Sequence, residues 1–282
     1  MGKSTLINRI VGSKVSITSQ RAQTTRHRIF GIKTRSDAQI VLVDTPGVHK
    51  KVTKTLNKII NKTARDSIEG VDLILIVVSA TGWRDEDDYP LSLIKEAKCP
   101  SILVINKIDM LRHKQELLPF IENCRNKFAF SEFVPVSARS GENVANLEEL
   151  IGTMLPTGDL CFPEEQLSDK GQKFMAAELV REQLCRLLGQ ELPYSTAVEI
   201  EEFSVKPTIT DISINIWVEK SGQKAIVIGD KGETLKKIGE RSRLQMENMF
   251  GSKINLQLWV KIRKGWADNT IALRGLGYLN EG

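Results

Sequence analysis

The stretch SILVINKID at residues 101–109 decides the class of the fold. Residues 101–105 form a nearly continuous apolar run, which predicts a strand covered on both faces. Strands of this kind belong to parallel sheets, whose strands are joined by helical crossovers. The polar residues from Asn106 to Asp109 therefore come at the carboxyl end of a buried strand.

The chain on either side of this stretch alternates apolar strands with helical patterns from residue 1 to residue 155. Helical spacing is clear near the start, where Leu6, Ile7, Ile10 and Val11 share one face. Further strands are predicted at residues 29–34, 39–43, 71–79 and 133–136. This alternation indicates an α/β domain with a mostly parallel sheet and flanking helices.

A different pattern follows a proline-containing linker at residues 156–170. The predicted second domain, residues 171–282, is α+β. It has a helix at 172–188, then strands whose apolar residues alternate with polar ones, which predicts a sheet with one exposed face. The predicted order is α-β-β-α-α-β. Trp217 and Trp259 fall on the polar face, where they either stack on a base or, as we expect, pack under the first domain.

The phosphate-binding part of a nucleotide site is predicted at three places. Gly2-Lys3-Ser4-Thr5 matches the end of the G-x-x-x-x-G-K-[ST] loop, whose Lys3 reaches the phosphates and whose Ser4 binds Mg²⁺. Asp44-Thr45-Pro46-Gly47 ends a strand, so that Asp44 can hold Mg²⁺ through water and the Gly47 N–H can sense the γ-phosphate. Thr25, in preference to Thr24, is the expected third Mg²⁺ ligand, in a segment that changes after hydrolysis.

The base-binding part is predicted at the ends of two later strands. The Asp109 carboxylate can accept two hydrogen bonds from guanine N1–H and N2–H₂, and adenine offers no such pair of donors. Asn106 can reach the base N7, the Lys107 stem can cover the ring, and the Ala138 N–H after Ser137 can contact guanine O6. Each motif alone is common. All of them in this order, each at a strand end, predict a site for GTP or GDP with Mg²⁺ on a P-loop NTPase-type domain.

An RNA-binding loop is predicted in the second domain at Gly229-Asp230-Lys231-Gly232, between two helices. A GxxG loop lets the backbone approach RNA phosphates, and Lys231, Lys236 and Lys237 add positive charge. Residues 224–264 hold ten Lys and Arg against four Asp and Glu. This surplus of six positive charges is larger than the net charge of +5 of the whole chain.

These motifs together resemble the Era family of ribosome-assembly GTPases. The resemblance is carried from residue 2 to near the C-terminus by QTTRHRI at 23–29, the motifs at 44–47, 106–109 and 137–138, and the segments 162–164, 191–195, 227–232, 258–261 and 265–268. It implies a GTPase domain followed by a type II KH domain. It also implies binding near the 3′ end of 16S ribosomal RNA during small-subunit maturation, with peripheral membrane association at the inner face of the cell membrane.

Two departures from the general GTPase pattern lead to expectations. Val48 stands where many GTPases place a glutamine that orients the attacking water, as in the Era group, so we expect slow hydrolysis. The chain begins at Met1 in the middle of the phosphate loop, with the first strand and the first half of that loop missing. We therefore expect poor nucleotide affinity and a marginal first domain in this chain.

Cysteine content and motif counts narrow the classes of protein to which this chain could belong. Four dispersed cysteines argue against a zinc site and fit a reducing cytosol, so we expect a cytoplasmic protein. We also expect a monomer. A single DTPG and a single NKxD argue against a tandem-domain GTPase, and Asp109 argues against an ATPase. The alternative from another class is an RNA-binding module whose truncated GTPase domain does not turn over nucleotide.

Overall fold

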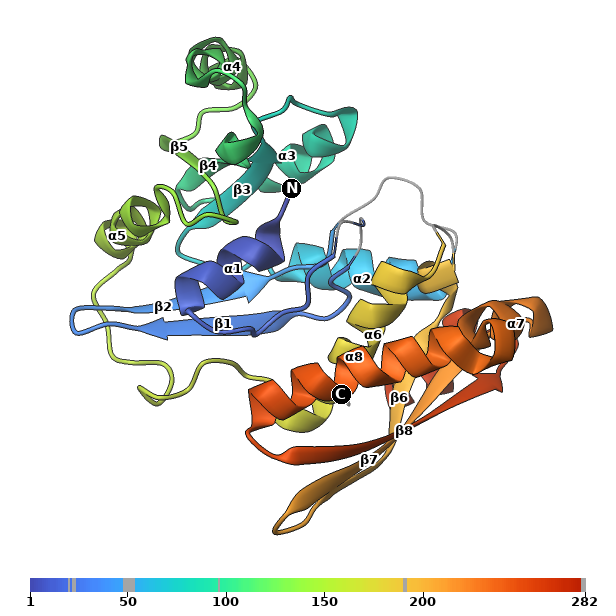
Figure 1. Ribbon diagram of the computed structural model, residues 1–282. Helices are drawn as coiled ribbons and strands as arrows, with labels where there is room; N and C mark the ends of the chain where they lie inside the picture. Colours follow the sequence, from blue (N-terminus) through green and yellow to red (C-terminus); the bar gives the residue numbers. More distant parts are fainter. Residues whose placement is uncertain (20, 22–23, 48–53, 96, 190–191, 280–282) are drawn as a thin grey trace. The chain divides into compact units, whose positions relative to one another are not determined.

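The computed structural model describes the whole chain except residues 20, 22–23, 48–53, 96, 190–191 and 280–282 (Figure 1). Its contacts divide the chain into two compact units. Unit 1 comprises residues 1–18, 25–52 and 60–169, and unit 2 comprises residues 19–24, 53–59 and 170–282. Each unit has its own hydrophobic core, and the two are described separately.

Unit 1 contains a parallel sheet with the order β3-β4-β5 and an antiparallel hairpin, β1-β2. The central strand β4 is buried at all six positions, as its apolar run predicts. The strands are β1 (Ile29–Thr34), β2 (Gln39–Asp44), β3 (Ile74–Ser79), β4 (Ser101–Asn106) and β5 (Glu132–Val136). The helices are α1 (Lys3–Val11), α3 (Asp88–Ile94), α4 (Leu117–Arg125), α5 (Val144–Met154) and α2 (Thr55–Asp66), of which residues 55–59 belong to unit 2.

The core of unit 1 lies on both faces of the parallel sheet. One cluster joins the apolar face of α1, including Leu6 and Ile10, to Val104 and to α5. A second cluster packs α3 and α4 against Leu103 and Ile105 on the other face. Because neighbouring residues of β4 point to opposite faces, its unbroken apolar run serves both clusters.

The predicted linker lies against the hairpin of unit 1. The Ile32 N–H donates to the Leu167 carbonyl at 2.9 Å, and Gly31 and Ser168 form an isolated antiparallel bridge. Gln39 exchanges two side-chain hydrogen bonds, both of 2.9 Å, with the backbone of Phe162. The segment from 162 to 169 thus covers the edge of β1 that β2 leaves open.

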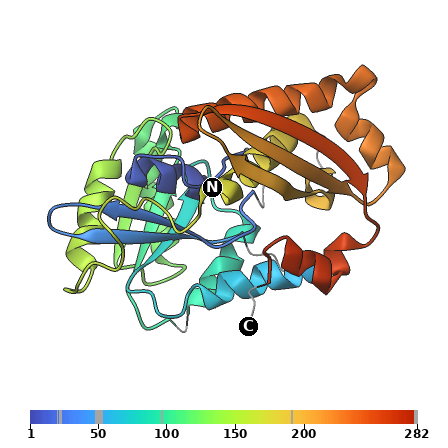
Figure 2. The same ribbon diagram turned by 90° about the horizontal axis from the view of Figure 1, so that it is seen from below.

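Unit 2 has the predicted α-β-β-α-α-β order, with one short helix after it. Its elements are α6 (Gln172–Leu187), β6 (Ala197–Val205), β7 (Ile209–Val218), α7 (Ser221–Ile228), α8 (Glu233–Phe250), β8 (Lys253–Ile262) and α9 (Thr270–Gly275). The sheet has the order β6-β7-β8, with β6 antiparallel and β8 parallel to β7. Figure 2 shows α8 running along one face of this sheet.

The alternating pattern of the three strands decides which side of the sheet carries the core. Ile212, Ile214 and Ile216 of β7 are buried in one cluster with residues of α6 and α8. The residues that alternate with them, Asn215 and Trp217 among them, face the opposite way because side chains alternate along a strand. Among the described residues, no helix is long and apolar enough to cross a membrane.

Candidate functional site

The phosphate end of the candidate site lies at the start of α1. Gly2 has φ +92°, a left-handed conformation that glycine adopts without strain. A Cβ atom on Gly2 would lie 2.6 Å from Asn106 Nδ2, so a side chain would also collide with the strand β4. Lys3, Ser4 and Thr5 then form the first turn of α1, where backbone N–H groups lack helical partners and favour phosphate oxygens.

Three hydroxyl groups converge on one oxygen of Asp44, the last residue of β2. Its Oδ2 accepts hydrogen bonds from Ser4 Oγ at 2.8 Å, Thr25 Oγ1 at 3.1 Å and Ser16 Oγ at 2.6 Å. The hydroxyls of Ser4 and Thr25 are 3.0 Å apart. The structure thus brings together the three residues that the sequence predicts as Mg²⁺ ligands.

The other oxygen of Asp44 makes this cluster fit a cation. Asp44 is 1% exposed, and its Oδ1 has no hydrogen-bond donor in the described part of the chain. A buried carboxylate oxygen without a partner is costly. Hard oxygen ligands, here one carboxylate and two hydroxyls, are those that Mg²⁺ prefers, so these residues fit that ion.

The two adjacent threonines have different hydrogen-bond partners. Thr25 is buried and its hydroxyl lies on Asp44. The hydroxyl of Thr24 instead donates to the Arg21 carbonyl at 2.9 Å and contacts Ser19. The side chain of Thr24 is therefore not part of the cluster around Asp44.

The side chain of Asn106 connects the two ends of the site. Its Oδ1 accepts the backbone N–H groups of Ala138 at 2.9 Å and Lys107 at 2.8 Å, and its Nδ2 donates to the Met1 carbonyl at 2.8 Å. The Ala138 N–H, expected to contact guanine O6, is thus already bonded to the buried Asn106 side chain. It can contact a base only by sharing this hydrogen between two acceptors.

The base end is formed by Asp109 and its neighbours. Lys107 has φ +67°, so the chain turns sharply after β4 and Asp109 follows on an exposed single turn of 3₁₀ helix. The Ser137 hydroxyl donates to Asp109 Oδ1 at 2.7 Å and accepts the Ser140 N–H at 3.1 Å. This contact fixes the carboxylate at the edge of the sheet, while its exposure leaves it accessible to a ligand.

The remaining predicted residues of this site fall into two groups. Thr45, Pro46 and Gly47 continue the chain beyond Asp44 and are described, whereas Val48 and Gln23 lie outside the described residues. Ser16 is a component that the sequence motifs do not indicate. It is fully buried and donates the shortest of the three hydrogen bonds to Asp44.

The predicted RNA-binding loop lies between α7 and α8 of unit 2. Gly229 has φ +76° and ψ 179°, Lys231 has φ +46° and Gly232 has φ +84°. A Cβ atom on Gly229 would lie 2.2 Å from Thr234 Oγ1 and 2.9 Å from the Thr234 backbone nitrogen. Both the conformation and the close approach therefore require glycine at position 229.

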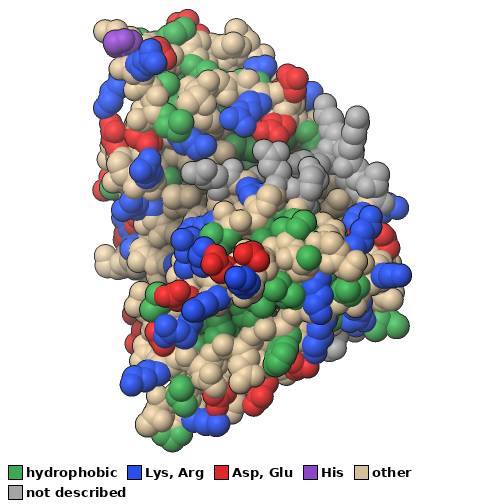
Figure 3. All heavy atoms as spheres, turned by 45° about the vertical axis from the view of Figure 1, so that its right-hand side comes forward, with side chains coloured by type: hydrophobic (Ala, Val, Ile, Leu, Met, Phe, Trp, Pro, Cys, Tyr) green, Lys and Arg blue, Asp and Glu red, His purple; other side chains and the backbone are tan. Residues whose placement is uncertain are grey.

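The charged side chains of this region are exposed. Asp230 and Lys231 lie at the tip of the loop, and Lys236 and Lys237 lie on the first turns of α8. Lys237 forms an ion pair of 3.4 Å with Glu233, which exposure makes weak. Figure 3 shows Lys and Arg side chains interspersed with apolar and acidic ones on the face in view, rather than one unbroken basic patch.

Comparison with known proteins gives matches over both units. A family model described as 50S ribosome-binding GTPase matches residues 1–107, and a KH domain model matches residues 191–267. GTPase Era of Histophilus somni (strain 129Pt) is 49% identical over 282 residues, covering 100% of this chain and 94% of that protein. GTPase Era of Coxiella burnetii (strain Dugway 5J108-111) is 48% identical over 278 residues, covering 99% and 94%.

Two solved structures are similar over nearly the whole chain. One is a variant of Aquifex aeolicus Era bound to GDP and AlF4⁻, with a TM-score of 0.95, 38% identity, and coverage of 99% of this chain and 95% of that one. The other is Era in complex with MgGDPNP and nucleotides 1506–1542 of 16S ribosomal RNA, with the same TM-score, identity and coverage. The P-loop GTPase and KH folds expected from the sequence are therefore confirmed.

Proposed function

Because this chain belongs to the GTPase Era family, we propose that it is a slow GTPase that binds 16S ribosomal RNA through its KH domain and assists assembly of the small ribosomal subunit. The observation that carries the proposal is the side chain of Asn106. It joins the phosphate loop to the base-binding segment, so that one ligand with a guanine at one end and phosphates at the other spans both.

Different residues of unit 1 bind different parts of the nucleotide. Ser4, Thr25 and Asp44 hold Mg²⁺, which when bound neutralises charge on the β- and γ-phosphates. Lys3, at the N-terminus of α1, adds a fixed positive charge to the same phosphates. The Gly47 N–H senses the γ-phosphate, and Asp109 selects guanine.

Slow hydrolysis follows from the residue after Gly47. Val48 has no polar side-chain atom and cannot orient a water molecule, so at this position the chain offers no group that positions the nucleophile. Replacing Val48 by Ala should change the single-turnover rate of GTP hydrolysis little. A thousandfold loss would show that Val48 has a role that this mechanism does not include.

Binding of RNA is supported by the GxxG conformation and by the similar Era structure that contains nucleotides 1506–1542 of 16S ribosomal RNA. The proposal includes a monomeric cytoplasmic protein that contacts the inner face of the membrane peripherally. Its support here is the family alone.

Two measurements on the full chain test the proposal. Single-turnover hydrolysis of radiolabelled GTP should require Mg²⁺ and should fall at least about tenfold in Ser4→Ala, which removes a metal ligand and its bond to Asp44. Fluorescence anisotropy with an RNA spanning nucleotides 1506–1542 should show binding that Lys231→Asp weakens. RNA binding without any GTP turnover would instead favour an RNA-binding module that does not hydrolyse nucleotide.

A further inference from the structure

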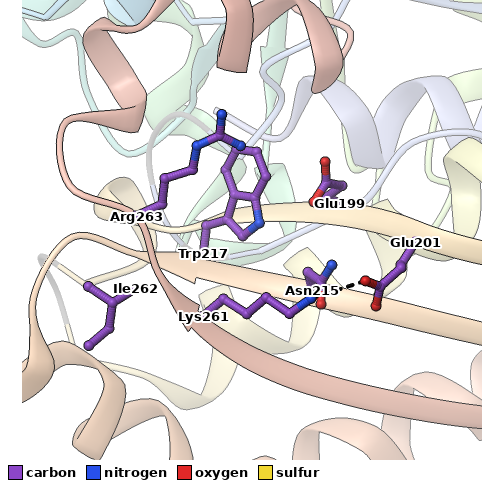
Figure 4. A pocket seen from close by; sticks show the side chains of 7 residues that line it. All are labelled: Glu199, Glu201, Asn215, Trp217, Lys261, Ile262 and Arg263. Carbon is purple, nitrogen blue, oxygen red and sulfur yellow. Dashed lines mark hydrogen bonds and ion pairs between the residues drawn. The ribbon is translucent and has the colours of Figure 1, made fainter.

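The face of the KH sheet that points away from the helices carries a polar cavity. The cavity has a volume of about 350 Å³ and is lined by residues of all three strands of unit 2 (Figure 4): Glu199, Glu201, Asn215, Trp217, Lys261, Ile262 and Arg263. The GxxG loop joins α7 to α8, which pack on the opposite face of the sheet. The cavity is therefore separate from the loop already described.

The central feature of the cavity is the amide of Asn215. Asn215 is 4% exposed, and its Oδ1 has no hydrogen-bond donor in the parts of the chain that the structure describes. The Asn215 amide lines the cavity beside the Glu201 carboxylate and, after Lys261, lowers the pKa of Glu201. A buried acceptor left in this way is costly unless a ligand supplies a donor.

A β-bulge adds Glu201 to the lining of the cavity. Between Ile200 and Glu202 the register of β6 against β7 shifts, and Glu201 is the extra residue. Bulges of this kind re-aim side chains. The Lys261 ammonium, 3.0 Å from Glu201, and after it the Asn215 amide hold the pKa of Glu201 below its usual range. Glu201 therefore stays charged beside the Asn215 amide, whose oxygen has no donor among the described residues.

A second acceptor and two donors complete the polar lining. Glu199 is directly opposite Asn215 in the register of β6 and β7, and no ion pair or side-chain hydrogen bond engages its carboxylate among the described residues. Lys261 and the guanidinium of Arg263, which lies 4.0 Å from the centre of the Trp217 ring, provide donors. The four charges balance, so the lining suits a neutral polar ligand with donors on one edge and acceptors on another.

An exposed aromatic ring stands beside these groups. Trp259 of β8 is opposite Asn215 on its other side, so that Glu199, Asn215 and Trp259 form one row across the sheet. The Trp259 side chain is 55% exposed, whereas Trp217 is buried. Exposed aromatic side chains on a sheet are platforms on which unpaired nucleobases stack.

We propose that this face of the KH sheet binds one unpaired nucleobase of single-stranded RNA, stacked on Trp259, with guanine fitting best. Guanine N1–H and N2–H₂ are adjacent donors for Asn215 Oδ1 and the Glu199 carboxylate, and guanine O6 and N7 accept from the cationic side chains. Uracil has a single ring donor and no amine. The inference rests on the RNA binding proposed above but assigns it a second contact, distinct from the GxxG loop.

The test uses the full chain saturated with GDP, so that the nucleotide site of unit 1 does not take up the probe. Anisotropy is measured with three labelled twelve-nucleotide RNAs without 5′ phosphate: all uridine, uridine with one central guanosine, and uridine with one central inosine, which lacks the exocyclic amine. Trp259→Ala should weaken binding of the guanosine RNA by roughly 5- to 150-fold, the range for loss of one stacked base, and Trp259→Phe by much less. Ile271→Ala, which removes another exposed apolar side chain of unit 2, should have no effect.

The base preference is tested with Asn215→Ala and Glu199→Gln. The unmodified chain should bind the guanosine RNA more tightly than the inosine and all-uridine RNAs, and Asn215→Ala should lose this preference. Glu199→Gln keeps one acceptor oxygen and should lose the preference for the guanosine RNA only in part. Thermal unfolding of each variant checks that the fold is kept.

The outcomes separate this inference from the proposed function. If Lys231→Asp weakens RNA binding and Trp259→Ala does not, the cavity is no base site and the GxxG function stands. If the unmodified chain binds neither these RNAs nor nucleotides 1506–1542, the proposed RNA binding itself fails. Equal weakening of all three RNAs by Trp259→Ala, with the guanosine preference kept in Asn215→Ala, would overturn the assignment of Asn215.

Discussion

Replacing Ser16 by Ala should lower the free energy of unfolding of unit 1 by about 1.5–3 kcal/mol, the usual value of a hydrogen bond to a charged group. Ser16 is fully buried and donates to Asp44 Oδ2 at 2.6 Å, so water cannot replace the lost hydroxyl. Ser4 and Thr25 still donate to the same oxygen. The loss should therefore stay below that of an unpaired buried charge, about 3–5 kcal/mol.

Hydrogen exchange of the β4 amides, measured without nucleotide, reports this free energy for unit 1 alone because every residue of β4 is buried in it. Ser92→Ala is the matched control. Its hydroxyl donates to the Tyr89 carbonyl on the exposed side of α3, and its loss should change the free energy by less than about 0.5 kcal/mol.

A double-mutant cycle identifies the partner. In an Asp44→Asn background the Ser16 hydroxyl meets no charge, and Ser16→Ala should cost only about 0.5–1.5 kcal/mol. The reasoning is refuted if the β4 amides are as well protected in Ser16→Ala as in the unmodified chain, or if the cost of Ser16→Ala is the same in both backgrounds.

Three further outcomes are expected. Asp109→Asn should shift preference from GTP toward xanthine nucleotides in competition binding, because an amide cannot accept both guanine donors; retained GTP preference would count against Asp109. Gly229→Ala should weaken RNA binding roughly tenfold without changing GTP hydrolysis, since its Cβ meets Thr234 at 2.2 Å. Gly232→Ala, whose Cβ has nothing within 4 Å, should weaken RNA binding less. Equal losses of RNA affinity in anisotropy would contradict this. Burial raises the pKa of the Cys124 thiol to about 11, so as pH rises from about 9 to about 11 the unfolded chain loses a proton that the folded chain keeps. The free energy of unfolding should therefore fall over this range by up to about 2–3 kcal/mol more than in Cys124→Ala. The same pH dependence for both proteins in urea unfolding would disprove this.

Sequence patterns were sufficient to predict the structure wherever a local pattern is compatible with only one structure. The run at 101–105 is apolar on both faces, and it forms the fully buried central strand. The alternating isoleucines of β7 are enough to place Asn215 and Trp217 on the outer face of the second sheet. The convergence of Ser4 and Thr25 on Asp44 was predictable as well, because each of the three stands at a motif position.

The remaining contacts depend on distances in space that no local pattern carries. Ser16 is an isolated serine 28 positions from Asp44, and no motif marks it. The bond from the Ala138 N–H to Asn106 joins the ends of two strands and engages a donor that the motif alone assigns to the base. Helix α3 has only seven residues, too few for a helical period to show. The bulge that adds Glu201 to the outer face is a tertiary feature of the β6–β7 pairing.

The segment from 162 to 169 has a consequence for how the first unit avoids self-association. Its hydrogen bond to Ile32 and its bridge to Gly31 occupy backbone groups that would otherwise be open to a strand from another molecule. A fragment ending at residue 155 would expose that edge, and its copies could pair along β1, whereas one ending at Asp169 would carry its own protection. The segment that links the two units in sequence thus also protects unit 1 from aggregation, because it covers the open edge of β1.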